Sequence, residues 1–247
     1  MAFVGCCDHK EAERLGIKQL GASACGATAL YTALLMLKVA DEDMVHNLDW
    51  SLATVRSRAY NAPLPQYLLS RHNAGCTGDE LISSMKTILA HSNLSEHVIC
   101  EDFVPFHVLK QPIVDYFADI LTQGYIVIAT FNLQILGNDA WHHQVVYGVD
   151  TDQRLLFCTN PLGPYDEDLA TAFLSTHSVL VVRKEDITTR YHREGGDYSI
   201  YNLPLWQRME VQKQVEEVVQ EGSLRDFVMI PAAYVAGFAL FKKASIS

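Results

Sequence analysis

Apolar and polar positions alternate along the chain in a way that predicts helices first and strands afterwards. Residues 26–38 form an apolar run of good helix formers with no Gly or Pro after the first position, which predicts a helix. Thr77 and Glu80 form a capping-box pattern at the start of a second amphipathic segment, since their side chains can satisfy free backbone N–H groups. A third helix is predicted over residues 112–123, with Gly124 as its stop signal.

Strand signals then take over. Four runs are rich in β-branched and aromatic residues and are separated by turn residues: 125–131, 144–148, 154–158 and 178–183. Polar residues 150–153 have the composition of a hairpin connection between the second and third runs. The two strands that they join are therefore expected to be neighbours.

The last part of the chain adds one helix and more strands. Residues 205–221 fit an amphipathic helix, and the apolar stretch 227–241 predicts one or two strands. Helices followed by an antiparallel sheet indicate an α+β fold. The chain has no internal repeat, low-complexity segment or Pro/Gly-rich linker, so a single domain over residues 1–247 is expected.

Composition excludes several classes of protein. The formal net charge is −10, from 19 Lys and Arg against 29 Asp and Glu, and no long basic run is present, so no nucleic-acid partner is expected. No apolar stretch reaches the roughly 18 uncharged residues of a membrane span. Neither the spacing of a structural zinc site nor a phosphate-binding loop is present, so no metal and no cofactor are expected. Without a signal peptide or a CxxC motif, the six cysteines are expected to be reduced thiols of a cytoplasmic protein.

One combination of residues predicts nucleophilic chemistry. Cys25 precedes the first helix, where free N–H groups and the helix dipole lower the pKa of a thiol. His142 and Asn160 flank the predicted hairpin, so strand pairing brings them to its open end, where the Asn160 side chain can orient the imidazole. Gln19 offers an amide donor that, with the backbone N–H of Cys25, can form an oxyanion hole.

Two of these assignments have rivals. His143 is adjacent to His142, and strand alternation sends the two side chains to opposite faces; the spacing to Gly148 favours His142 as the base. Asp150 is an alternative orienting group if Asn160 points away. Pro161 is expected to hold Asn160 in an extended conformation.

The order Gln19, Cys25, His142, Asn160 resembles that of the papain-like cysteine peptidases. Residues 19–30 and 142–150 are similar to two blocks of the bacteriocin-processing peptidases, which cut after a double-glycine leader. The resemblance covers a small part of the chain and implies helices packed on a barrel-like sheet, with the active site in the groove between them. Three departures stand in these regions: Thr28 replaces a small residue, Leu162 replaces a shielding Trp, and Asn160 replaces the Asp of an Asp-Pro pair.

Together, these residues predict a cysteine peptidase that hydrolyses a peptide or isopeptide bond of a peptide or protein substrate through an acyl-enzyme. Two alternatives stay open: an acyl or peptidyl transferase that uses the same residues, and a catalytically silent protein-binding module. The polar segment 49–76 is a candidate loop over the groove.

Overall fold

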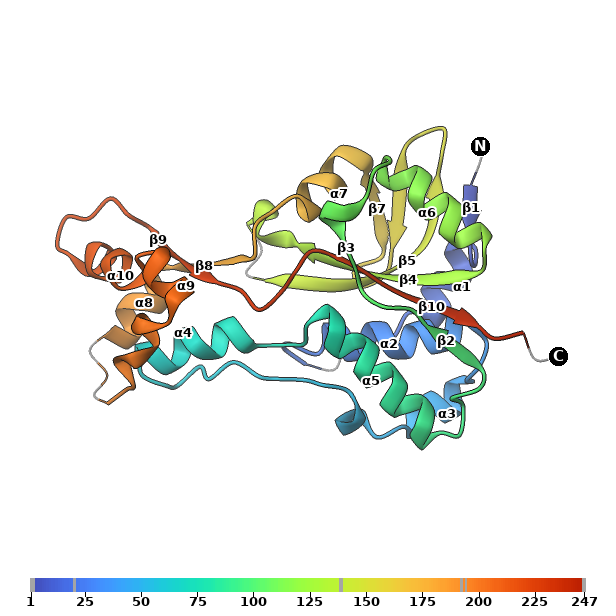
Figure 1. Ribbon diagram of the computed structural model, residues 1–247, viewed down its shortest axis with the longest axis horizontal. Coiled ribbons are helices and arrows are strands. Elements are labelled where there is room, and N and C mark those ends of the chain that lie inside the picture. The colour runs from blue at the N-terminus through green and yellow to red at the C-terminus, as the bar shows by residue number, and fades with distance from the viewer. Residues whose placement is uncertain (1–2, 20, 138–139, 192, 194, 246–247) are drawn as a thin grey trace.

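An antiparallel sheet forms the centre of the computed structural model, which describes residues 3–19, 21–137, 140–191, 193 and 195–245 (Figure 1). Within these residues the sheet has eight strands in the order β2-β10-β4-β5-β6-β7, with β1 paired to β5 and β3 paired to β10. The strands are β1 (Phe3–Gly5), β2 (Val98–Cys100), β3 (Val104–Pro105), β4 (Tyr125–Asn132), β5 (Trp141–Asp150), β6 (Leu155–Cys158), β7 (Gly163–Asp166) and β10 (Gly237–Lys243).

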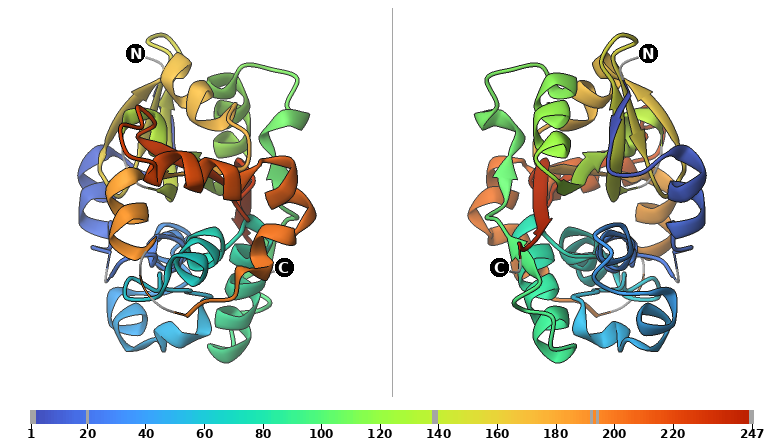
Figure 2. Two further views of the ribbon diagram at one scale, coloured as in Figure 1. Left: turned by 90° about the vertical axis from the view of Figure 1, so that its left-hand side faces the viewer. Right: turned by 90° about the vertical axis from the view of Figure 1, so that its right-hand side faces the viewer.

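Helices cover both faces of this sheet (Figures 1 and 2). One face carries α1 (His9–Leu15), α2 (Cys25–Met36), α3 (Glu42–Asn47) and α5 (Gly78–His91), and the other carries α6 (Ile113–Thr122) and α7 (Glu167–Leu174). Seven of the eight residues of β4 are buried, because apolar residues on both sides of that strand meet a helical layer. The mixed architecture confirms the predicted α+β class.

A second group of elements lies to one side of the sheet, at the left of Figure 1, and is here called the lateral lobe. It contains α4 (Leu64–Asn73), α8 (Lys184–Tyr191), α9 (Pro204–Arg208), α10 (Val211–Val219) and a separate two-stranded sheet of β8 (Val179–Arg183) and β9 (Phe227–Pro231). Short 3-10 helices complete the described chain: η1 (Trp50–Leu52), η2 (Phe106–Val108), η3 (Leu133–Leu136) and η4 (Tyr198–Asn202).

Glutamine side chains close both edges of the lobe's small sheet. The Gln134 amide bonds the backbone N–H and C=O of Val181, and the Gln214 amide bonds the same groups of Met229. Val181 and Met229 are paired residues of β8 and β9. Because an amide side chain offers both a donor and an acceptor, each glutamine makes the two backbone hydrogen bonds that a neighbouring strand would otherwise make with that residue.

Most of the expected elements are present. Helix α2 begins at Cys25, α5 carries the full Thr77/Glu80 capping box, and α6 ends next to Gly124, whose φ is +82°. The hairpin is also confirmed, because Asp150 pairs with Leu155 where β5 turns into β6. The stretch predicted to hold one or two strands contains two, β9 and β10.

Other expectations are wrong or incomplete. The helix expected over residues 205–221 is broken into α9 and α10 at Glu210, whose φ of +51° no α-helix can continue through. Strand β8 was expected in the main sheet but belongs to the small sheet of the lateral lobe. Segment 49–76 is not a simple loop, because it contains η1 and α4. The amino-terminal strand β1 has no counterpart among the predicted elements.

Candidate active site

A narrow pocket of about 70 Å³ lies where the lateral lobe meets the sheet and α2. The residues that line it come from segments far apart in the sequence, and they include Gln19, Cys25, Arg58, His142, Leu180 and Tyr234. Three of the four predicted site residues therefore share one pocket. Asn160, the fourth, does not line the pocket but hydrogen-bonds His142 and Gln19.

Cys25 is the first residue of α2 and is 7% exposed. Burial raises the pKa of its thiol, which outweighs the opposing effect of the backbone N–H groups of His143, Gly26 and Cys25 and of the Arg58 charge. The sequence-based expectation that the helix N-terminus lowers the pKa of Cys25 is therefore wrong. A protonated thiol needs a group that takes its proton as the sulfur attacks, and His142 lines the same pocket.

His142 lies at the start of β5 and is half-buried. Its Nε2 is 2.5 Å from the backbone carbonyl oxygen of Asn160. A carbonyl can only accept, so Nε2 carries the hydrogen and Nδ1 is the nitrogen that can accept a proton. Burial lowers the pKa of His142, although the bond to the Asn160 carbonyl acts in the opposite direction. The imidazole is therefore neutral at pH 7, as a base requires.

His143 is held in a different environment on the other face of the strand. It is 1% exposed, its Nε2 donates to the Cys76 carbonyl at 2.9 Å, and its Nδ1 accepts from the Thr130 hydroxyl at 3.0 Å. Burial lowers its pKa to about 4. Both ring nitrogens are already bonded within the core, and this geometry favours His142 over His143 as the base.

Asn160 approaches His142 in an unexpected way. The sequence predicted that its side chain would bond the imidazole, but the backbone carbonyl does so instead. Its side-chain amide donates to Gln19 Oε1 at 3.2 Å. The predicted extended conformation is also wrong, because Asn160 has φ +53° and precedes a cis bond to Pro161. This left-handed conformation, which Asn adopts more readily than most residues, turns the carbonyl towards the histidine.

Gln19 lies on the loop before α2 and lines the pocket with Cys25. Its amide nitrogen donates to the Gly21 carbonyl at 2.7 Å, while its oxygen accepts from Asn160. An amide nitrogen carries two hydrogens, so one donor remains for a substrate oxygen. The fixed amide is consistent with the predicted oxyanion role, which stays a prediction.

Several residues of the site were not predicted. Leu180 lies in β8 of the lateral lobe and Tyr234 in the connection from β9 to β10, and no local pattern in the sequence connects either of them with Cys25. The Tyr234 ring stacks on Trp141, the residue before His142, with ring centroids 5.7 Å apart. Gln144 could have been found, since it lies two residues after His142 and therefore on the same face of β5.

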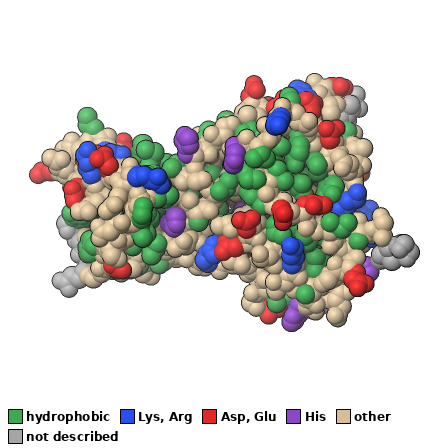
Figure 3. Space-filling model, in the orientation of Figure 1, with side chains coloured by type: hydrophobic (Ala, Val, Ile, Leu, Met, Phe, Trp, Pro, Cys, Tyr) green, Lys and Arg blue, Asp and Glu red, His purple; other side chains and the backbone are tan. Residues whose placement is uncertain are grey.

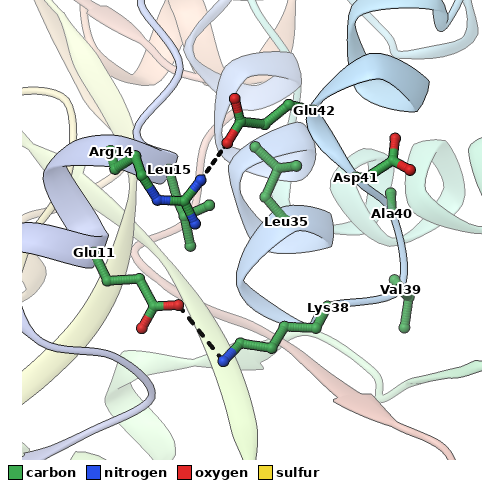
Figure 4. Close-up of a pocket in the computed structure, with 9 residues that line it drawn as sticks. All are labelled: Glu11, Arg14, Leu15, Leu35, Lys38, Val39, Ala40, Asp41 and Glu42. Carbon is green, nitrogen blue, oxygen red and sulfur yellow. Dashed lines mark hydrogen bonds and ion pairs between the residues drawn. The ribbon is translucent and has the colours of Figure 1, made fainter.

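A larger cavity of about 510 Å³ lies elsewhere, between α1 and the segment that joins α2 to α3 (Figure 4). Four of its five charged side chains form ion pairs, Arg14 with Glu42 and Lys38 with Glu11 at 3.5 Å, and the fifth, Asp41, accepts a hydrogen bond from the Met44 N–H. No Cys, Ser, Thr or His side chain lines this cavity, and its size alone does not identify it as a catalytic site.

Neither a metal centre nor a membrane span is found among the described residues. No three of their His, Cys, Asp or Glu side chains converge as metal ligands would. None of the helices in the same ranges has the length and apolar character that a bilayer span requires.

No protein-family model matches the sequence, and no curated protein matches it.

Proposed function

We propose that the chain is a cysteine peptidase with a papain-like arrangement, in which Cys25 is the nucleophile and His142 the base. One observation carries the proposal: a cysteine at a helix N-terminus and a histidine with a correctly fixed tautomer line the same narrow pocket. The Asn160 carbonyl requires the hydrogen on Nε2, which leaves Nδ1 as the proton acceptor.

The reaction that we propose is acyl transfer to the sulfur. The Cys25 thiol gives its proton to Nδ1 of His142 while Sγ attacks the carbonyl carbon of the substrate. The backbone N–H of Cys25 and the amide of Gln19 stabilise the oxyanion. Protonated His142 then donates to the leaving amine, and water hydrolyses the thioester to release the acid.

The substrate that we propose is a peptide or protein. On the face shown in Figure 3, basic and acidic side chains are interspersed, and no extended basic surface of the kind that nucleic acids prefer is visible there. All six cysteines, each in a described range, are unpaired thiols, which supports a reducing compartment such as the cytoplasm.

The first experiment measures the reactivity of each thiol with iodoacetamide between pH 5 and 9, mapped by mass spectrometry. A thiol–imidazole pair is reactive once His142 is neutral, so we expect Cys25 labelling to rise on a limb below pH 6.5 and then level off. In His142→Ala we expect labelling that rises only in alkaline solution, as the raised pKa of a lone buried thiol dictates. His9→Ala is the matched control, since His9 bonds the Tyr147 hydroxyl outside the pocket.

Peptide products then define the reaction. We expect new amino termini in a peptide library treated with the protein, and none with Cys25→Ala. Transfer to an added amine in place of hydrolysis would identify a transferase on the same residues. Labelling of Cys25 that is no faster than that of half-buried Cys100 and that ignores His142 would overturn the proposal. The burial of Cys25 would then favour the second candidate, a catalytically silent protein-binding module.

A further inference from the structure

Gln144 contacts the turn whose backbone carbonyl bonds His142. It lies on the same face of β5 as His142, two residues further along, and is fully buried. Its amide nitrogen lies 3.0 Å from the carbonyl oxygen of Thr159, 3.1 Å from that of Asn160 and 3.4 Å from that of Pro161. The middle carbonyl is the one that accepts from His142 Nε2.

Three carbonyl oxygens that converge on one point repel one another unless a donor lies between them. The Gln144 amide supplies two N–H groups there, and the turn depends on them electrostatically. The Asn160 amide does not do the same, because it is directed away, to Gln19.

The oxygen of the Gln144 amide is less well placed than its nitrogen. Its Oε1 is buried and has no hydrogen-bond partner among the described residues. A flipped amide would place this oxygen against the three carbonyls, so the observed orientation is the only acceptable one. A buried acceptor without a partner is destabilising, and an apolar residue at this position would avoid that cost.

We propose that Gln144 is the positioning residue of the site, holding the turn at residues 159–161 so that a backbone carbonyl, rather than the Asn160 side chain, orients His142. The inference rests on the proposed function only in giving His142 the role of base. The Asn160 side chain acts elsewhere, because it connects the histidine turn to Gln19 and thereby to the loop that precedes Cys25.

The test compares Gln144→Met, which keeps the volume but removes the donor, with Asn160→Gly, which removes the side chain and tolerates φ +53°. Gln214→Met is the matched control, because Gln214 is also buried and also donates to two backbone carbonyls, those of Met209 and Met229. Each variant is first shown to unfold cooperatively. Asn160→Ala is a second variant at that position.

Two readouts are made on every variant. The first is the rate of Cys25 alkylation by iodoacetamide at pH 7. The second is the ¹⁵N spectrum of the His142 ring in protein labelled at histidine, which reports directly which nitrogen carries the hydrogen and does not depend on catalysis.

We expect Gln144→Met to slow alkylation by about tenfold to a hundredfold, as misplacement of a catalytic group does, and to mix the two tautomers of His142. Asn160→Gly should change the rate by less than about threefold and keep the Nε2–H tautomer, because its carbonyl is retained. Gln214→Met should leave both readouts unchanged.

The opposite pattern would overturn the inference: a lost Nε2–H tautomer in Asn160→Gly together with an unchanged spectrum in Gln144→Met. If both variants alkylate slowly, the tautomer decides between the two explanations. Failure of the proposed function looks different, since wild-type Cys25 would then show no dependence on His142 while the ring spectra still report which residue positions the histidine.

Discussion

Replacing Gly26, the residue after the proposed nucleophile Cys25, by alanine should destabilise the protein through one identifiable contact. A Cβ atom at this position would lie well inside van der Waals contact of Cys76 Sγ, 3.1 Å from Leu81 Cδ2 and 3.3 Å from His143 Cδ2. These neighbours are all buried and cannot move freely. Overpacking of this kind costs about 1 to 3 kcal/mol, and the better helix propensity of alanine returns at most about 1 kcal/mol.

The cause of this loss can be isolated with a second substitution. We expect Gly26→Ala to lower the free energy of unfolding by about 2 kcal/mol. Cys76→Ala alone should cost about 1 to 2 kcal/mol, because it leaves a small cavity. The double variant should be no less stable than Cys76→Ala, since the new methyl group occupies the space that the sulfur leaves. The expected coupling energy is therefore about 2 kcal/mol.

Urea unfolding followed by circular dichroism measures all four proteins, with the slope of the transition as a check on two-state behaviour. Cys158→Ala provides the matched control, because Cys158 is a fully buried thiol that packs in the core on the α6 and α7 side of the sheet, away from Gly26. Its effect should therefore add to that of Gly26→Ala. A coupling energy below about 0.5 kcal/mol between Gly26 and Cys76 would refute the reasoning, because it would mean that the sulfur is not what alanine meets.

Three further predictions concern pH and backbone conformation. Burial lowers the pKa of His143 to about 4, so between pH 6.5 and 4 the unfolded state binds a proton at this histidine and the folded state does not. Urea unfolding should therefore show about 3 kcal/mol of stability lost over this range, and a flat profile would contradict the prediction. Pairing with Arg56 lowers the pKa of Glu80 to about 2, so Glu80→Gln should cost about 1 kcal/mol at pH 7, both groups being partly exposed. The cost should be smaller at pH 2, where the folded carboxyl group is about half protonated, and an equal cost at both pH values would argue against the ion pair. Gly75→Ala should lower the melting temperature for two reasons: φ is +78°, and the new Cβ would lie 2.5 Å from the Tyr234 hydroxyl. Adding Tyr234→Phe should relieve only the contact with the hydroxyl, so full recovery of the melting temperature would show that the backbone conformation does not cause the loss.

Local sequence determined the parts of this protein whose physics is local. The helix that begins at Cys25, the capping box of α5 and the hairpin of β5 and β6 each depend on residues within a few positions of one another. Hydrophobic periodicity, capping and turn chemistry operate over such distances. For the same reason the sequence could place Cys25 at a helix start and His142 beside the open end of a hairpin.

Tertiary structure decided which atoms of these residues meet. The sequence indicated that Asn160 would lie near His142, but whether its carbonyl or its amide faces the ring depends on the left-handed backbone at Asn160 and on Gln144 beneath the turn. The pKa of Cys25 was likewise misjudged, because burial by distant segments outweighs the local helix N-terminus.

The lateral lobe shows the same limit on a larger scale. Its small sheet pairs β8 with β9 across a long sequence separation. Strand β8 brings Leu180 to the pocket of Cys25, and the connection from β9 to β10 brings Tyr234 there. A strand pattern states that a segment is extended but not which partner completes its hydrogen bonds. The choice of pairing partner depends on the free energy of the whole packed structure, which no local sequence pattern specifies. In that structure Gln134 and Gln214 hydrogen-bond the backbone groups at the outer edges of β8 and β9.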